Sequence, residues 1–331
     1  MLKRVLGGSG IEASAVAFGA WAIGGWKWGG TDANASVDAI RASLESGVTL
    51  IDTAPVYGFG LSEEIVGKAI AGRRREDIII ATKCGLVWDR EAGTLHGQSE
   101  GRSIYRTLDP DSVREELEAS MRRLGVDYID LYQTHWPDPA SDMREVAETL
   151  DTLKQEGLVR AVGFCNASSA ELTASAELLD TDQERYSLLD RERDTDNLPV
   201  CQGADLAFLA YSPIAQGLLT GRIDAKREFA ESDLRSGNPR FKPRVLDAIE
   251  AVLAPVKALA RDRGVPTERV VLAWTLAQPG VTHVLAGTRS VEQAQANAAA
   301  GELVLHPEEI EVIDQAAAAW PGFESLAEEQ S

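Results

Sequence analysis

The sequence has few cysteines, no long apolar run and no sign of a secretory leader. Its three cysteines, Cys84, Cys165 and Cys201, cannot all pair and show no CxxC spacing, so neither a disulfide framework nor a metal cluster is indicated. No stretch approaches the roughly eighteen consecutive apolar residues that a membrane span needs. The start, MLKRVLGGSG, has basic residues but no apolar run after them. We therefore expect a cytoplasmic protein without a metal site or a membrane anchor.

Positive charge is also scarce. The 331 residues include 33 Lys and Arg against 52 Asp and Glu, a formal net charge of -19. This balance argues against nucleic acid as a partner, and a phosphorylated ligand would require a local cluster of positive charge. The length and the 44% hydrophobic content suit one large α/β barrel domain over residues 1–331. The oligomeric state is not indicated.

Short apolar runs typical of strands alternate with amphipathic helical patterns along the chain. The predicted strands are 15–20, 49–54, 77–83, 128–135, 159–165, 183–189, 207–213 and 282–288. The predicted helices are 33–46, 62–71, 111–124, 143–156, 169–178, 244–263, 268–277 and 291–299. Start and stop signals, such as Pro110 before one helix and Gly125 after it, support these boundaries.

Eight such alternations predict a (β/α)₈ TIM barrel. The alternative, a doubly wound sheet, normally opens with a GxGxxG turn, and the glycines of FGAWAIGGWKWGG do not follow that order. Two additions are expected: a β-hairpin over residues 3–14 at the barrel bottom, and an extra C-terminal helix over 308–319. A long segment, 214–243, follows the seventh strand, and loops of that length are usually functional.

Four polar residues lie where predicted strands end, which in a barrel is the active-site face. Asp52 and Tyr57 follow the second strand, Lys83 ends the third and His135 ends the fourth. Reducing a carbonyl places negative charge on its oxygen, so a nearby proton donor lowers the barrier. Tyr57 would be that donor. Its pKa, about 10 when unperturbed, would be lowered by the Lys83 ammonium, which Asp52 keeps charged; neutral His135 would orient the oxygen.

Each of these residues also has a simpler interpretation. Asp52 could cap the following turn, His135 could be structural, and Tyr57 could be a pocket wall. Lys83 could be the Schiff-base lysine of a barrel lyase. Their joint occurrence at successive strand ends favours the catalytic set.

Three segments carry a resemblance to a known family. IDTAPVYG, ATKCG and YQTHWPD resemble the active-site segments of the aldo-keto reductase superfamily. YSLLDRE, AYSPIAQGLLTG and GTRSVEQAQAN extend the resemblance over almost the whole chain, and the bacterial general-stress and sugar-related branch looks similar. The resemblance implies an NADP(H)-dependent oxidoreductase that interconverts an aldehyde or ketone and its alcohol. A cofactor-sensing regulatory subunit with the same barrel and a Schiff-base lyase using Lys83 remain alternatives.

The resemblance also implies a cofactor site. Asn166 and Gln183 would bind the nicotinamide carboxamide, Tyr211 would stack on its ring, and the segment 212–222 would cradle the pyrophosphate. Arg289 would contact the 2′-phosphate, so NADP(H) is favoured over NAD(H). The full predicted set is Trp21, Asp52, Asn166, Gln183, Tyr211, Ser212, Pro213, Ile214, Gln216, Gly217, Leu219, Arg222, Gly287, Arg289, Gln293 and Asn297.

The sequence departs from the family at two cofactor positions and leaves the substrate open. Cys165 replaces a common serine, and Ala296 replaces a common glutamate, which weakens the adenine-site assignment. Tryptophans in the predicted top loops suggest an aromatic pocket wall. The candidates are Trp28, Trp88 and Trp136, with Trp21 and Trp26 beside them. The long polar loop 86–107, with Asp89, Arg90, Arg102 and Arg106, suggests sugar- or polyol-like carbonyl substrates.

Overall fold

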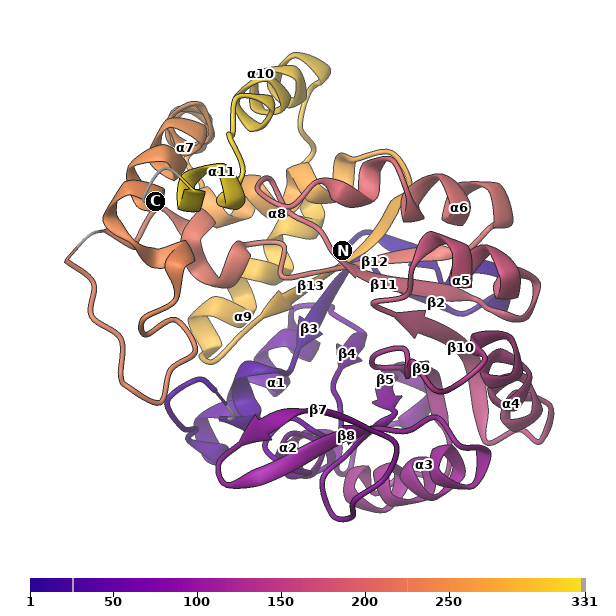
Figure 1. Ribbon diagram of the computed structural model, residues 1–331. Helices are drawn as coiled ribbons and strands as arrows, with labels where there is room; N and C mark the ends of the chain where they lie inside the picture. The colour runs from indigo at the N-terminus through magenta and orange to yellow at the C-terminus, as the bar shows by residue number, and fades with distance from the viewer. Residues whose placement is uncertain (26, 225, 329–331) are drawn as a thin grey trace.

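A computed structural model describes residues 1–25, 27–224 and 226–328, and Trp26 lies outside these described residues. Parallel strands close into a barrel (Figure 1), which confirms the predicted fold. Around the barrel the order is β10–β11–β12–β13–β3–β4–β5–β9. The strands are β3 (Val16–Gly19), β4 (Leu50–Asp52), β5 (Ile79–Cys84), β9 (Ile129–Thr134), β10 (Val159–Cys165), β11 (Thr181–Arg185), β12 (Ala207–Tyr211) and β13 (Val281–Gly287).

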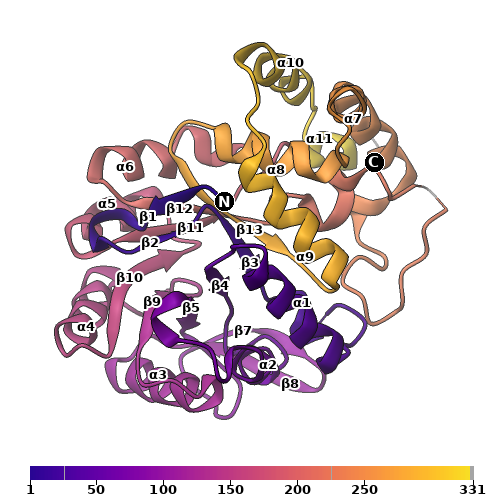
Figure 2. The same cartoon turned by 180° about the vertical axis from the view of Figure 1, so that it is seen from behind.

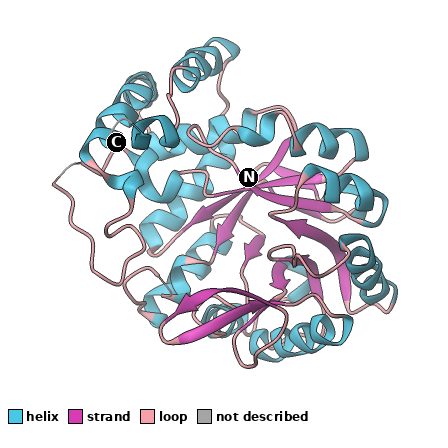
Figure 3. Cartoon of the chain, viewed as in Figure 1, coloured by secondary structure: helices cyan, strands magenta, loops and turns pink. Residues whose placement is uncertain are grey.

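Helices form the outer layer around the strands (Figure 3). They are α1 (Ala33–Glu45), α2 (Leu61–Ile70), α3 (Pro110–Leu124), α4 (Met143–Gln155), α5 (Ser169–Ser175), α6 (Asn197–Ala204), α8 (Thr267–Ala277) and α9 (Val291–Ala298). Their starts follow local capping chemistry. Asp32 accepts hydrogen bonds from two backbone N–H groups of α1, and Asp109 does the same for α3, which opens with a proline.

Three helices differ from the sequence prediction, and one of them, the short terminal helix α11 (Phe323–Glu328), was not predicted at all. α6 was not predicted, because its eight residues contain Pro199 and Gly203, which disfavour a helix in isolation. α7 (Pro243–Arg263) was predicted to be the helix after the seventh strand. It is instead an outer helix that packs on α8, on α10 (Pro307–Ala318) and on α11, while α8 packs on β13. The extra C-terminal helix is confirmed as α10.

A hairpin closes the amino-terminal end of the barrel, as predicted (Figure 2). β1 (Lys3–Val5) pairs antiparallel with β2 (Glu12–Ser14), and the buried side chains of Leu6 and Ile11 belong to the same apolar cluster as residues inside the barrel. Gly7 has a φ of 52°, and a Cβ there would lie 2.1 Å from the carbonyl oxygen of Asp180, just before β11. Only glycine fits this approach.

The segment 86–107 is a small sheet and not the open loop that we predicted. β6 (Leu86–Val87), β8 (Arg102–Arg106) and β7 (Thr94–Ser99) pair in that order, and the sheet lies beside the barrel mouth near α2 and α3 (Figure 1). Glu100 and Gly101 both have positive φ, as a two-residue β-turn between β7 and β8 requires. This sheet supplies one wall of the site described below.

The sixth strand also begins earlier than predicted. β11 covers Thr181–Arg185 and not 183–189. The prediction missed its start because the strand contains charged side chains, which are buried against α6 and the turn before α6. The apolar residues Tyr186 and Leu188 that suggested the strand are buried in the turn that follows. Among the described residues, none of the helices combines the length and apolar character that crossing a membrane requires.

Candidate active site

The ends of β4 and β5 bring together a buried ion pair. Asp52 is the last residue of β4, and Lys83 Nζ donates to its Oδ1 at 2.8 Å and its Oδ2 at 2.9 Å. Lys83 Nζ also donates to the carbonyl oxygen of Thr53 at 3.1 Å. Both side chains are buried, so each charge depends on the other for compensation. Asp52 therefore acts as the partner of Lys83 and not as a simple helix cap.

Tyr57 lies over this pair, in the turn that follows β4. The Lys83 nitrogen is 5.5 Å from its ring centroid, and the His135 ring meets the Tyr57 ring edge-on with centroids 5.5 Å apart. Burial raises the pKa of Tyr57 well above its ordinary value, and the nearby Asp52 carboxylate raises it further. The predicted lowering by Lys83 is therefore wrong for this state, because Asp52 binds the ammonium with both oxygens. Tyr57 is a neutral phenol that can donate its proton.

His135 follows β9 and is fixed by its backbone. Its backbone N–H donates to the carbonyl oxygen of Cys84 at 2.8 Å, and its backbone carbonyl oxygen accepts from Asn166 Nδ2 at 2.9 Å. Burial lowers the pKa of His135 well below its ordinary value, and the Lys83 charge lowers it further. The ring is therefore neutral and has one N–H to donate.

The predicted carboxamide-binding residues are connected to the same groups. Gln183 Nε2 donates to Asp52 Oδ1 at 2.9 Å, and Asn166 Oδ1 accepts from the Tyr211 hydroxyl at 2.7 Å. The thiol of Cys165, whose pKa burial raises, lies 3.7 Å from Gln183 Oε1 as a weak donor. Hydrogen bonds thus join Asn166 to His135 and Gln183 to Asp52.

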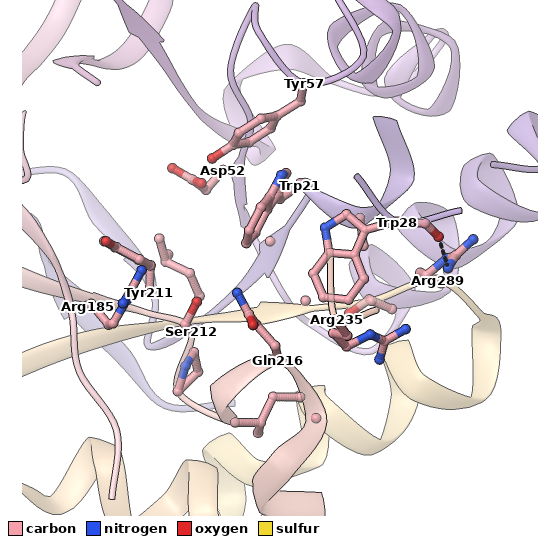
Figure 4. Close-up of a pocket in the computed structure, with 18 of the residues that line it drawn as sticks. Trp21, Trp28, Asp52, Tyr57, Arg185, Tyr211, Ser212, Gln216, Arg235 and Arg289 are labelled. Carbon is pink, nitrogen blue, oxygen red and sulfur yellow. Dashed lines mark hydrogen bonds between the residues drawn. The ribbon is translucent and has the colours of Figure 1, made fainter. Parts of the chain in front are cut away.

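One cavity of about 630 Å³ begins at these groups and extends across the barrel mouth. Figure 4 shows Tyr57 and Asp52 on one side, Arg289 on another, and Trp21 and Trp28 between them. The predicted residues that line it are Trp21, Trp28, Asp52, Tyr57, His135, Trp136, Asn166, Gln183, Tyr211, Ser212, Pro213, Ile214, Gln216, Gly217, Arg222, Gly287, Arg289 and Gln293.

Four predicted residues are not among the described residues that line this cavity. Lys83 is completely buried and bonded to Asp52. Leu219 is also completely buried, in the apolar core, and Trp88 packs against Phe59 with ring centroids 5.6 Å apart. Asn297 Nδ2 donates to the carbonyl oxygen of Gly287 and to the Thr288 hydroxyl, so Asn297 holds the loop after β13.

The polar residues that we predicted in 86–107 have other partners. Arg90 donates to the Ser112 hydroxyl at 2.7 Å, and its Nη1 lies 3.5 Å from Asp89 Oδ1. The guanidinium carbon of Arg102 lies 4.7 Å from the centroid of the Phe59 ring. Arg106 donates to His96 Nδ1 at 2.9 Å. The residues that line the cavity and that the predicted site set missed include Leu86, His96, Arg185, Arg227 and Arg235.

Comparison with known proteins identifies the family. The model of the Aldo/keto reductase family matches residues 15–318. The chain belongs to the aldo/keto reductase family. It is 40% identical over 292 residues to the aldo-keto reductase YhdN of Bacillus subtilis (strain 168), covering 87% of this chain and 85% of that protein. It is 38% identical over 307 residues to an NADH-specific methylglyoxal reductase of Escherichia coli (strain K12), covering 91% and 93%.

Solved structures agree with this family and with the enzyme class. The glycerol dehydrogenase AKR11B4 of Gluconobacter oxydans matches with a TM-score of 0.86 and 37% identity, over 96% of each chain. An aldo-keto reductase of Klebsiella pneumoniae in complex with NADPH matches with a TM-score of 0.72 and 29% identity, over 97% of this chain and 96% of that one. The chain is therefore an oxidoreductase of the aldo-keto reductase type.

In this aldo-keto reductase, the segment after β12, predicted to cradle the pyrophosphate, is a turn with left-handed backbone positions. Ser212, Ala215, Gln216 and Gly217 all have positive φ, between 46° and 100°. The backbone N–H groups of Ala215 and Gly217 donate to the carbonyl oxygens of Ser212 and Ile214, which fixes this turn. Ser212, Gln216 and Gly217 of this turn line the same cavity as Asn166.

The two predicted phosphate-binding arginines of the reductase already have protein partners. Arg222 pairs with the carboxylate of Glu268. Arg289 Nη1 donates to the carbonyl oxygen of Trp28 at 3.0 Å, and its Nη2 donates to that of Gly30 at 2.8 Å. Arg289 is exposed, and these bonds use two of its five N–H donors.

The donor set of the reductase fits a nicotinamide dinucleotide. The amides of Asn166 and Gln183, the turn after β12 and the Arg289 guanidinium all line this cavity. The indole nitrogens of Trp21 and Trp28 are, in addition, buried donors without a partner among the described residues. A long, partly charged ligand with acceptors along its length would match this arrangement.

Proposed function

We propose that this enzyme transfers hydride between a nicotinamide dinucleotide and the carbonyl carbon of a small polar aldehyde or ketone, with Tyr57 as general acid and base. The observation that carries the proposal is that the proton-donating side chains and the predicted nicotinamide-binding amides line one cavity. Neutral Tyr57 and neutral His135 line the same end of the cavity as the amides of Asn166 and Gln183. When bound, the nicotinamide supplies or accepts the hydride.

The protein's own residues then manage the charge on the substrate oxygen. The Tyr57 hydroxyl donates its proton to that oxygen during reduction and recovers it during oxidation. The His135 N–H donates a hydrogen bond to the same oxygen and fixes its direction. Asp52 connects the catalytic groups with the cofactor-binding amides, since it accepts hydrogen bonds from both Lys83 and Gln183.

The proposed cofactor is NADP(H) in preference to NAD(H). Arg289 supports this choice because its exposed guanidinium lies on the cavity wall, and three of its N–H donors have no hydrogen-bond partner among the described residues. The two relatives with named cofactors differ: the Klebsiella pneumoniae structure contains NADPH, and the Escherichia coli enzyme is named NADH-specific. The choice therefore depends on Arg289 and is tested in the Discussion.

The proposed substrates are small, sugar- or polyol-like carbonyl compounds. Trp28 and Trp136 supply apolar faces of the kind that pack against carbon chains, and Arg185 and His96 supply donors in the same cavity. Two relatives support this class by their names, a glycerol dehydrogenase and a methylglyoxal reductase, because glycerol and methylglyoxal are both small oxygen-rich compounds.

The direct test mixes the pure protein with NADPH or NADH and a panel of aldehydes, ketoses and α-dicarbonyls, and follows nicotinamide absorbance. Turnover should fall about 10²- to 10⁴-fold in Tyr57→Phe, because the proton donor is lost. The Kd for the cofactor should stay near the wild-type value. A Tyr57→Phe variant with wild-type turnover would contradict the mechanism.

Two alternatives have their own outcomes in this test. Tight cofactor binding without turnover on any carbonyl would identify a cofactor-sensing subunit. Borohydride trapping of a substrate on Lys83 would identify a Schiff-base lyase. The buried Lys83 ammonium, which donates to Asp52 and Thr53, disfavours the lyase, because a nucleophilic amine must be accessible and neutral.

A further inference from the structure

His96 is directed into the cavity by an irregularity in β7. The pairing of β7 with β8 shifts register between Leu95 and Gly97, with His96 at the shift. Such a bulge re-aims the side chain that it contains. Leu95 is 56% exposed, whereas His96 is half-buried and lines the cavity beside Trp136, with ring centroids 5.6 Å apart.

The protonation of the His96 ring follows from its partner. Arg106 Nε donates to His96 Nδ1 at 2.9 Å. A guanidinium has no acceptor and keeps its protons, so Nδ1 must provide a lone pair and Nε2 must carry the hydrogen. Burial, with Arg106 and Lys27, lowers the pKa of His96, which keeps the ring neutral. Arg106 is itself held by the carbonyl oxygen of Pro137 at 3.2 Å and by the Trp136 ring.

The Nε2–H of His96 is therefore a fixed donor that the proposed chemistry does not use. This nitrogen has no hydrogen-bond partner among the residues that the structure describes. It is also not one of their unpartnered polar atoms that are buried, so it is accessible to a ligand. His96 lies close enough to His135 to influence its pKa, so the two rings share one end of the cavity. His135 and Tyr57 serve the reacting oxygen, which leaves the His96 donor for another oxygen.

We propose that His96 is a specificity-determining residue whose Nε2–H binds a second oxygen of the substrate, so that the enzyme prefers carbonyl compounds with a further carbonyl or hydroxyl group. This inference rests on the proposed function and narrows its substrate class. A site built to hydrogen-bond a substrate oxygen discriminates against the analogue that lacks it, because the donor is then left unpaired.

The test compares kcat/KM for matched substrates, methylglyoxal against propanal and hydroxyacetone against acetone. In His96→Phe, the ratio within each pair should fall about tenfold, mainly through KM of the oxygenated member. His96→Gln should recover part of the ratio, because its amide N–H reaches a similar position. Leu95→Thr, on the same strand but directed away from the cavity, is the control and should leave both ratios unchanged.

Each other outcome has a defined meaning. An equal loss on both members of a pair in His96→Phe would show that His96 only supports the hairpin, and an unchanged ratio would remove its role altogether. Either result overturns the inference and leaves the proposed function intact. Wild-type protein that reduces no carbonyl with either cofactor would overturn the proposed function, and this inference with it.

Discussion

The centre of the cavity and its rim are built differently. At the centre, Asp52 and Lys83 come from neighbouring strands, are buried, and bond to each other. At the rim, Arg289 is exposed and donates to carbonyl oxygens of the loop that contains Trp28, and His96 belongs to a hairpin outside the barrel. Strand ends thus fix the groups proposed for the reaction, whereas loops present the groups proposed to select ligands.

Removing the central lysine should produce the largest effect. In Lys83→Met, Asp52 remains as a buried carboxylate without its cation, which typically costs about 3–5 kcal/mol of the free energy of unfolding. Turnover should also be lost, because the support of Tyr57 and Gln183 through Asp52 is disturbed. Chemical denaturation and the nicotinamide assay measure the two losses separately.

The matched controls separate burial from charge. Arg114→Met removes a cation from an exposed pair with Glu156 and should cost much less stability. Adding Asp52→Asn to Lys83→Met should recover part of the stability but none of the activity. A Lys83→Met protein as stable and active as the wild type would show that Asp52 does not depend on Lys83, and that the buried pair contributes no more than an exposed one.

The centre was predictable from sequence and much of the rim was not. Asp52, Lys83 and His135 are fixed by strand ends, and strand ends follow from the alternating pattern of apolar runs. His96 was missed because β7, with the sequence TLHGQS, has little strand character and its bulge depends on pairing with β8. The pKa direction of Tyr57 was wrong, because it depends on burial and on the distance to Asp52 in the folded chain.

A substitution at the rim should change cofactor choice and not chemistry. Arg289→Ala should raise KM for NADPH about tenfold or more, since a charge-assisted contact to phosphate would be lost. KM for NADH should change by less than about threefold, because NADH lacks the 2′-phosphate. Steady-state kinetics with both cofactors measures this difference.

The alternative role of Arg289 predicts a different pattern. Its bonds to the carbonyl oxygens of Trp28 and Gly30 also hold the loop over the cavity. If that is its sole contribution, both cofactors should be affected equally. An equal rise in KM would therefore remove the 2′-phosphate contact and leave Arg289 as a support of the Trp28 loop.

The smallest expected effect concerns pH, and it tests whether the central charges compensate each other. Tyr57 stays protonated as pH rises toward 10, because its pKa is raised, and His135 stays neutral as pH falls toward 6.5, because its pKa is lowered. The kcat for reduction should therefore vary by less than about twofold between roughly pH 6.5 and 9.5. A fall in kcat as pH rises, with its midpoint in the alkaline half of this range, would show that the Lys83 charge lowers the pKa of the Tyr57 hydroxyl despite Asp52.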